Sequence, residues 1–153
     1  MKLLESGVNI STITVMVQKE VAMRMAAGPG GKDYGALSVA VQFYSDTSII
    51  AKAEPSCFIP QPKVASSVIR MDIKKEPKVK TIDNDFYFKV VKSAFGQRRK
   101  TLVNALANSP YISLSKENIL QGIKEAGFAE TIRGEKLSIY DFAKLCDILY
   151  RYK

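Results

Sequence analysis

The chain has 153 residues, of which 46% are hydrophobic and 25% charged, and its formal net charge is +8. No apolar run approaches the roughly 18 residues that span a bilayer, so no membrane partner is expected. The absence of histidine excludes a Ser-His or Cys-His nucleophile, and with only Cys57 and Cys146 a metal site is not expected. Two cysteines so far apart favour reduced thiols and a cytoplasmic location.

The first half of the chain alternates strand and helix patterns, which is typical of an α/β sheet. Residues 13–17, from Ile13 to Val17, are almost all apolar and rich in β-branched side chains, which predicts a strand covered on both faces. Residues 1–7 have the pattern of the last turns of a helix closed by glycine, as expected if the chain continues a longer protein. Four further segments follow in order: helices at 18–27 and 36–44, and strands at 45–52 and 64–73.

A proline-rich segment, Phe58-Ile59-Pro60-Gln61-Pro62-Lys63, lies between the last two of these strands. Each proline fixes φ and lacks an N–H, so this segment is expected to be stiff and extended. An aromatic ring at the head of such a loop can offer its face to a ligand. It can equally plug a hydrophobic core, and the residues alone leave both interpretations open.

Residues 76–84 are charged, interrupted by proline and without periodicity, which predicts a linker. Residues 85–153 then show only helical patterns. One uninterrupted helix would bury Arg99 on the same face as Phe88 and Phe95, so two helices are expected to meet near Gly96. Three residues are expected to cap helices in this region: Asp85, Ser115 and Ser138.

Positive charge is concentrated in one part of the chain. Residues 1–75 carry a net charge of +3 and residues 76–153 one of +5, and between residues 86 and 116 there are six basic residues and no acidic one. A run of one sign favours a polyanionic partner such as nucleic acid. A solvated helix face and a helical DNA-binding protein are the alternatives.

Five segments that together cover nearly the whole chain form one pattern. They are Val17-Gln18-Lys19-Glu20-Val21-Ala22 with Arg24, Tyr34-Gly35 with Leu37-Ser38-Val39, Phe58-x-Pro60-x-Pro62-Lys63-Val64-x-Ser66, Phe95-x-x-Arg98-Arg99-Lys100 with Leu102, and Arg133-x-Glu135-x-Leu137-Ser138 with Phe142. In this order and spacing they resemble the ribosomal RNA adenine dimethyltransferases, which include the bacterial small-subunit rRNA adenine dimethylases and their erythromycin-resistance relatives.

The resemblance implies an α/β plus all-α fold that corresponds to the C-terminal part of such an enzyme. Residues 1–75 would be a remnant, about three strands, of a Rossmann-like methyltransferase sheet. Residues 76–84 would be the linker, and residues 85–153 a small helical rRNA-binding domain. The family's S-adenosylmethionine loop, its acidic ribose ligand and its Asn-Leu/Ile-Pro-Tyr motif do not occur in this sequence. No residue is therefore assigned to catalysis, to cofactor binding or to a metal.

The implied activity is methyl transfer from S-adenosylmethionine to the exocyclic amine of adenine in small-subunit rRNA, during ribosome biogenesis. By resemblance, Phe58 would stack on the target base and Pro60 would lie near the RNA. Lys63 would either lie near the RNA backbone or brace the loop. The phosphates would be bound by a basic cluster at the start of a helix, where positive charge opposes the macrodipole: Arg98, Arg99 and Lys100.

The resemblance also implies limits for this chain by itself. It is expected to retain RNA docking but to bind no cofactor and to be inactive. The alternative is a stand-alone, non-catalytic RNA-binding or ribosome-assembly module. Strand 13–17 would expose an apolar edge, and this edge is expected to promote self-association. At Ala65 the family usually has Asp or Asn, so local hydrogen bonding at the start of the following strand is expected to be lost.

Overall fold

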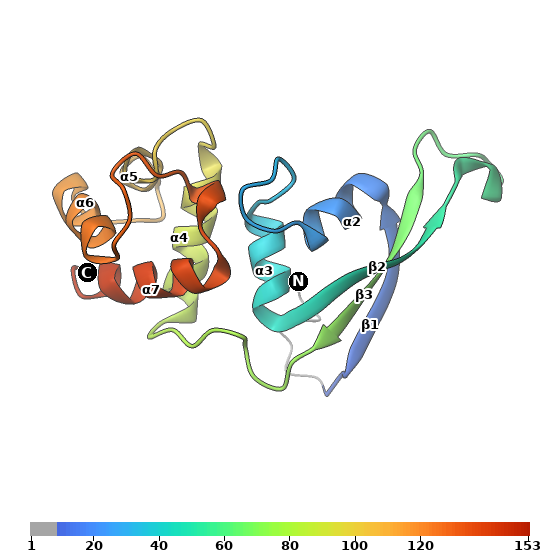
Figure 1. The fold of residues 1–153 in the computed structure, drawn as a ribbon, viewed down its shortest axis with the longest axis horizontal. Coiled ribbons are helices and arrows are strands. Elements are labelled where there is room, and N and C mark those ends of the chain that lie inside the picture. Colours follow the sequence, from blue (N-terminus) through green and yellow to red (C-terminus); the bar gives the residue numbers. More distant parts are fainter. Residues whose placement is uncertain (1–8) are drawn as a thin grey trace. The chain divides into compact units, whose positions relative to one another are not determined.

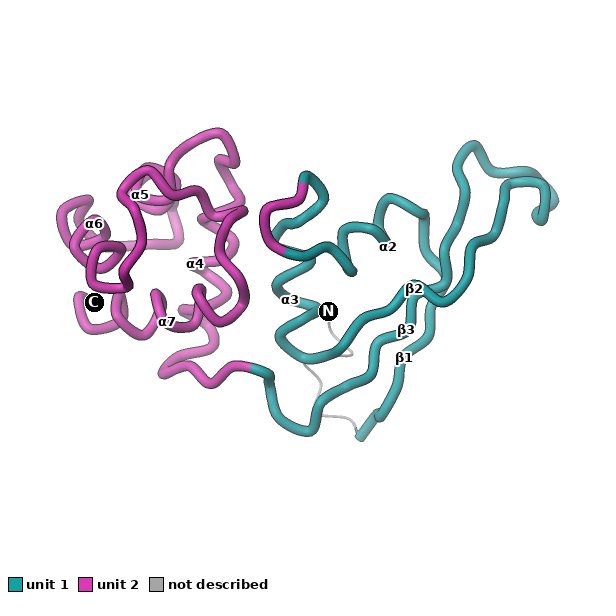
Figure 2. Tube along the Cα trace, in the orientation of Figure 1, with its two compact units in different colours: residues 1–28, 32–78 teal, residues 29–31, 79–153 magenta. Residues whose placement is uncertain are grey.

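The computed structural model describes residues 9–153, which divide into two compact units (Figures 1 and 2). The first unit extends to Lys78 without residues 29–31, and the second comprises Val79–Lys153 together with residues 29–31. The change of unit between Lys78 and Val79 falls inside the segment predicted as a linker. The helix expected over residues 1–7 lies outside the described residues.

The first unit contains the three strands and two helices that the sequence predicts. They are β1 (Thr12–Gln18), α2 (Lys19–Ala26), α3 (Ala36–Tyr44), β2 (Ser45–Ala53), the 3-10 helix η1 (Pro55–Cys57) and β3 (Ser66–Ile73). The strand order is β1-β3-β2, and β3 is antiparallel to both neighbours. It follows that β1 and β2 run parallel to each other on either side of β3 (Figure 1).

Helices α2 and α3 cover one face of this sheet (Figure 1). Met25 of α2 and Val41 of α3 pack against Ile69 and Met71 of β3. Side chains alternate across a strand, so Ile13, Val15 and Val17 of β1 join this core while Met16 is 53% exposed on the other face. The prediction that this strand is covered on both faces is therefore wrong for the described residues.

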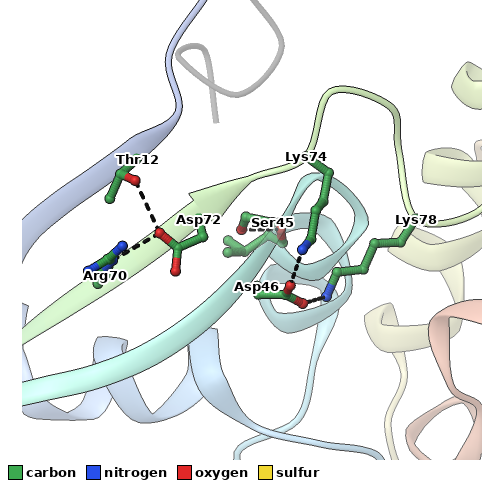
Figure 3. A network of polar contacts seen from close by, with 8 residues as sticks. Thr12, Ser45, Asp46, Arg70, Asp72, Lys74 and Lys78 are labelled. Carbon is green, nitrogen blue, oxygen red and sulfur yellow. Dashed lines mark hydrogen bonds and ion pairs between the residues drawn. The ribbon is translucent and has the colours of Figure 1, made fainter.

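Two groups of polar contacts hold the end of the sheet from which the chain leaves β3 (Figure 3). Asp46 pairs with Lys74 and Lys78, and these hydrogen bonds hold the pKa of its carboxyl below the ordinary value. Asp72 accepts hydrogen bonds from Arg70 Nε at 2.9 Å and from Thr12 Oγ1 at 3.1 Å, and its pKa is lowered chiefly by Arg70. Two lysine side chains of the segment after β3 are thus paired with Asp46 of β2.

The second unit is entirely helical. Its elements are α4 (Asn84–Gly96), α5 (Leu102–Ala107), α6 (Lys116–Glu125), the 3-10 helix η2 (Gly134–Lys136) and α7 (Ile139–Tyr150). The break at Gly96 is confirmed, because α4 ends there and α5 begins only at Leu102. No helix in the described part of the chain is long and apolar enough to cross a membrane.

Two of the three predicted helix caps are confirmed. The Ser115 hydroxyl accepts from the Asn118 N–H at 3.1 Å, and Ser138 forms a reciprocal capping box with Asp141. The cap of α4 is Asp83 rather than Asp85, because the helix starts at Asn84 and the Asp83 carboxylate accepts from the Phe86 N–H at 2.9 Å. Asp85 lies in the first turn instead, where its charge still favours the helix dipole.

The core of the second unit is formed by side chains from all four helices. The largest fully buried ones are Tyr87, Phe142, Leu102, Leu106, Ile119, Ile123, Leu137, Leu145 and Leu149. On α4 the buried face includes Tyr87 and Val90, whereas Phe88 and Phe95 are only partly buried. Glycine permits one close approach: a Cβ on Gly134 would lie 2.9 Å from the Ala94 Cβ and 3.1 Å from its carbonyl oxygen.

Candidate nucleic-acid interface

The proline-rich segment is the connection of a β-hairpin. Strands β2 and β3 pair up to Ala53 and Ser66, and residues 54–65 join them. The connection begins with η1, whose turn is closed when the Phe58 N–H donates to the Pro55 carbonyl at 3.2 Å. Phe58 then takes up an extended conformation (φ −125°, ψ 147°) with its ring partly buried. The predicted extended conformation is thus present at Phe58, whereas the chain bends over residues 58–60 instead of continuing straight to Pro62.

Pro60 and Lys63 lie further along the same loop, and both side chains are exposed. The peptide bond between Ile59 and Pro60 is cis, and the Ile59 side chain is fully exposed. One loop therefore presents an aromatic ring, an aliphatic side chain and a cation to the solvent.

The exit of this loop is held by the main chain at Ala65. Its carbonyl accepts from the N–H of Lys19, the first residue of α2, at 2.9 Å. Gln18, the N-cap residue of α2, makes no side-chain capping hydrogen bond. The end of the loop at Ala65 is thus joined to the start of α2 by a backbone hydrogen bond, and α2 begins without a side-chain cap.

The basic cluster lies in the turn between α4 and α5. Arg98, Arg99 and Lys100 are all exposed, and the Lys100 N–H closes the turn on the Gln97 carbonyl at 2.9 Å. The cluster follows the C-terminus of α4 directly, where positive charge complements the helix dipole. The expectation that the cluster lies at the start of a helix is therefore wrong, because α5 begins at Leu102 with Thr101 as its N-cap and the cluster precedes that cap.

The three cations of the cluster differ in their surroundings. The Arg98 guanidinium lies 3.4 Å from a carboxylate oxygen of Glu135, beside η2. Arg99 and Lys100 form no ion pair with any described residue, which leaves their charge open to a polyanion. The close approach of Gly134 to Ala94 brings this carboxylate to the end of α4.

Other reactive side chains form no alternative site in the described part of the chain. No group of three or more acidic or cysteine side chains there could hold a metal ion. Cys57 is exposed and Cys146 is buried, and both are free thiols. Burial raises the pKa of the Cys146 thiol well above its ordinary value, so it stays protonated and is a poor nucleophile.

The comparisons with known proteins agree with this geometry. The model of the ribosomal RNA adenine dimethylase family matches residues 1–150. The chain belongs to the ribosomal RNA adenine dimethylase family. The resemblance drawn from the motifs around Phe58, Arg98 and Glu135 is thereby confirmed.

Curated relatives in this family are named ribosomal RNA small subunit methyltransferase A. The chain is 54% identical over 149 residues to the protein of Lachnoclostridium phytofermentans and covers 97% of itself and 51% of that protein. It is 51% identical over 149 residues to the protein of Clostridioides difficile, with coverage of 97% and 51%. The chain thus spans about half the length of the curated relatives it matches, which fits a C-terminal part.

Two solved structures have a similar fold. A dimethyladenosine transferase from Plasmodium falciparum superposes with a TM-score of 0.78 at 22% identity, covering 94% of this chain and 59% of that one. The 23S rRNA methyltransferase ErmE superposes with a TM-score of 0.64 at 19% identity, covering 96% and 57%. The sheet of this dimethylase-family chain is therefore part of a Rossmann-like methyltransferase sheet followed by a helical unit, as predicted.

Sequence reasoning missed two contacts in the helical unit of this dimethylase-family chain. The Arg98–Glu135 pair joins two of the quoted motifs that are 37 residues apart. The Lys92 ammonium lies 4.1 Å from the centre of the Tyr111 ring. The only sequence signal for the second contact was the presence of an aromatic residue within the acid-free run of residues 86–116.

Proposed function

We propose that this chain supplies the target-base and RNA-docking parts of an S-adenosylmethionine-dependent rRNA adenine dimethyltransferase. The enzyme would act on small-subunit rRNA or a precursor of the small ribosomal subunit, in the cytoplasm. The observation that carries this proposal is the position of Phe58, with its ring partly exposed at the head of a stiff hairpin loop within the family motif.

The chemistry explains why such a ring is needed. Methylation of the exocyclic amine of adenine requires the base to leave its stack and to be held between apolar or aromatic surfaces. Phe58 would form one of these surfaces. Pro60 would restrict the backbone of the loop, and Lys63, which is exposed on the same loop, would bind a phosphate.

The described residues do not fit S-adenosylmethionine. In the family, the loop that binds S-adenosylmethionine is rich in glycine and joins a strand to a helix. Here β1 passes directly into α2 at Gln18 and Lys19, with no glycine between them. The glycine-rich residues 28–31 follow helix α2 and are not a substitute. The cofactor would supply the methyl group in the full-length enzyme, and we propose that this chain by itself neither binds it nor turns over.

A non-catalytic RNA-binding or ribosome-assembly module remains the second candidate. It is favoured by the helical unit, which has its own core and carries the exposed basic turn. We also propose that the chain self-associates through β1, one of the two edge strands of the sheet.

Replacement of Phe58 tests the main proposal. Fluorescence anisotropy would measure binding to a labelled small-subunit rRNA stem-loop that carries unpaired adenines. Because the variant can no longer stack on a base, Phe58→Ala is expected to weaken binding by about 5- to 150-fold. Ile59→Ala is the matched control, since Ile59 is fully exposed beside Phe58 but cannot stack, and its affinity should stay at the wild-type value.

Equal losses of affinity in the two variants would contradict the base-stacking role of Phe58. Unchanged binding by Phe58→Ala, with the basic turn still required, would favour the non-catalytic module. Isothermal titration with S-adenosylmethionine tests the proposal that this chain by itself does not bind the cofactor. Micromolar binding would overturn it.

A further inference from the structure

The outward face of α4 carries two lysines at helical spacing. Lys89 and Lys92 are three residues apart and both exposed, so they are neighbours on the helix surface. Val90, Val91 and Ala94 point into the core. Residues two apart on a helix point in nearly opposite directions, so Ala94, which packs against Gly134 beside Glu135, faces away from Lys92.

An exposed aromatic ring lies beside these lysines. Tyr111 is 44% exposed, and the Lys92 ammonium lies 4.1 Å from the centre of its ring. At an exposed site a cation over a ring face is weakly attracted to the ring, which favours this orientation of the ring. The remaining exposed part of the ring is available to a partner.

Hydrogen bonds fasten this tyrosine to α4. The Tyr111 N–H donates to the Ser109 hydroxyl at 3.2 Å, and that hydroxyl lies 2.6 Å from the hydroxyl of Ser93. The Ser93 hydroxyl also lies 2.7 Å from the carbonyl of Lys89. The turn over residues 109–112 is closed by the Ile112 N–H, which donates to the Ser109 carbonyl at 3.4 Å, and the Ile112 side chain is buried. This network therefore fixes the backbone at Tyr111 against the backbone of α4, and the cation–π contact places the ring beside Lys92, so the ring and the lysines are brought together before a partner binds.

The charges around this group select the chemistry of the partner. No acidic residue occurs between residues 86 and 116, and neither Lys89 nor Lys92 forms an ion pair with a described residue. An apolar protein surface would leave two cations desolvated without partners. A duplex offers phosphates but no free base face. Single-stranded RNA offers both phosphates and bases that can stack on an aromatic ring.

We propose that Tyr111, Lys89 and Lys92 form a second RNA-contact site, in which an unpaired base stacks on Tyr111 and the two lysines bind the adjacent phosphates. This tyrosine–lysine site rests on the proposed function only in that RNA is the partner. It lies in the helical unit, uses none of the residues of the Phe58 loop, and docks single-stranded RNA rather than the base that is methylated.

Anisotropy with a short labelled oligoadenylate, and with a fully paired RNA duplex of the same length, tests this site. Tyr111→Leu removes the ring but keeps an apolar side chain, and we expect it to weaken oligoadenylate binding by roughly 5- to 150-fold. Tyr111→Phe keeps the ring and should bind as the wild type does. Lys89→Ala with Lys92→Ala should lower the salt slope by about 0.7 for each phosphate that the variant no longer binds.

Tyr140→Leu is the matched control, because Tyr140 is a 61% exposed tyrosine on α7 in the same unit. Circular dichroism melting of each variant checks folding. Wild-type affinity of Tyr111→Leu, an equal loss of affinity in Tyr140→Leu, or an equal loss for duplex and oligoadenylate would each overturn the tyrosine–lysine site. If Phe58 proves not to stack on a base, the expected results for Tyr111, Lys89 and Lys92 stay the same. If the wild-type chain binds neither the oligoadenylate nor the duplex, both the tyrosine–lysine site and the proposal that this chain docks RNA are overturned.

Discussion

Arg98, Arg99 and Lys100 are adjacent in the chain but differ in electrostatic surroundings. Arg98 faces the Glu135 carboxylate at 3.4 Å, whereas Arg99 and Lys100 have no acidic partner among residues 9–153. Because both members of the Arg98–Glu135 pair are partly exposed, the pair adds little stability. Its main effect is to reduce the positive potential available at Arg98. The two following cations should therefore contribute more to binding a polyanion.

Alanine replacements in the basic turn test this difference. The double variant Arg99→Ala, Lys100→Ala should lower the slope of log affinity against log salt by about 0.7 to 0.9 for each phosphate that it no longer neutralises. Arg98→Ala should change the slope less, and Glu135→Gln should steepen it by removing a negative charge beside Arg98. RNA titrations at several salt concentrations measure these slopes. An unchanged slope in the double variant would place the RNA surface elsewhere.

The two edge strands of the sheet differ in how well they are protected from further pairing. Strand β2 carries Asp46 and Lys52 and has a register irregularity between Ile49 and Ala51, and charges and bulges both discourage edge pairing. Strand β1 has seven residues without a charge, a proline, a glycine or a bulge. Antiparallel pairing of two copies centred on Val15 would keep the core-facing residues of both strands on one face.

A lysine on β1 should prevent this self-association. We expect Met16→Lys to remove concentration-dependent association of the wild-type chain, because an edge lysine resists burial in a continuous sheet. Ile50→Lys is the matched control: Met16 and Ile50 are each 53% exposed, but Ile50 lies on β2. Sedimentation velocity over a range of concentrations measures the outcome. A strictly monomeric wild-type chain, or equal effects of both lysines, would rule out pairing through β1.

At the scale of the whole molecule, each unit contains carboxylates whose pKa is lowered by favourable contacts. Lys74 and then Lys78 lower the pKa of Asp46, and Arg70 is the main cause of the lowered pKa of Asp72. In the helical unit the Tyr152 hydroxyl lowers the pKa of Glu125. A carboxyl with a lower pKa in the folded state stabilises the fold above its ordinary pKa. That contribution disappears as the pH falls through the lowered value.

Acid should therefore destabilise the whole chain. We expect the Tm to be stable near neutral pH and to fall as the pH drops below about 4, where these carboxylates become protonated. Asp46→Asn should lower the Tm at neutral pH and reduce the further decrease in acid. Glu54→Gln, in the exposed hairpin loop, is the control and should follow the wild type. Calorimetry across this range would contradict the assignment if Asp46→Asn and wild type had parallel Tm profiles.

Local signals in the sequence were sufficient for the elements and for the motif that carries the base-stacking proposal. Proline, glycine and serine act within a few residues, so the extended backbone at Phe58, the helix end at Gly96 and the caps at Ser115 and Ser138 were predictable. The exception is the cap of α4: Asp83 and Asp85 are chemically equivalent, and the choice depends on where packing starts the helix.

Only the tertiary structure decided which distant side chains meet. It left one face of β1 open, because α2 and α3 both pack on the other face. It also placed Glu135 beside Arg98, through the close approach of Gly134 to Ala94, and brought Tyr111 to Lys92. Such contacts depend on the packing of whole helices rather than on neighbouring residues, so no local pattern could predict them. The sequence by itself therefore determined the family and the candidate loop, and packing determined which charges and rings face a partner.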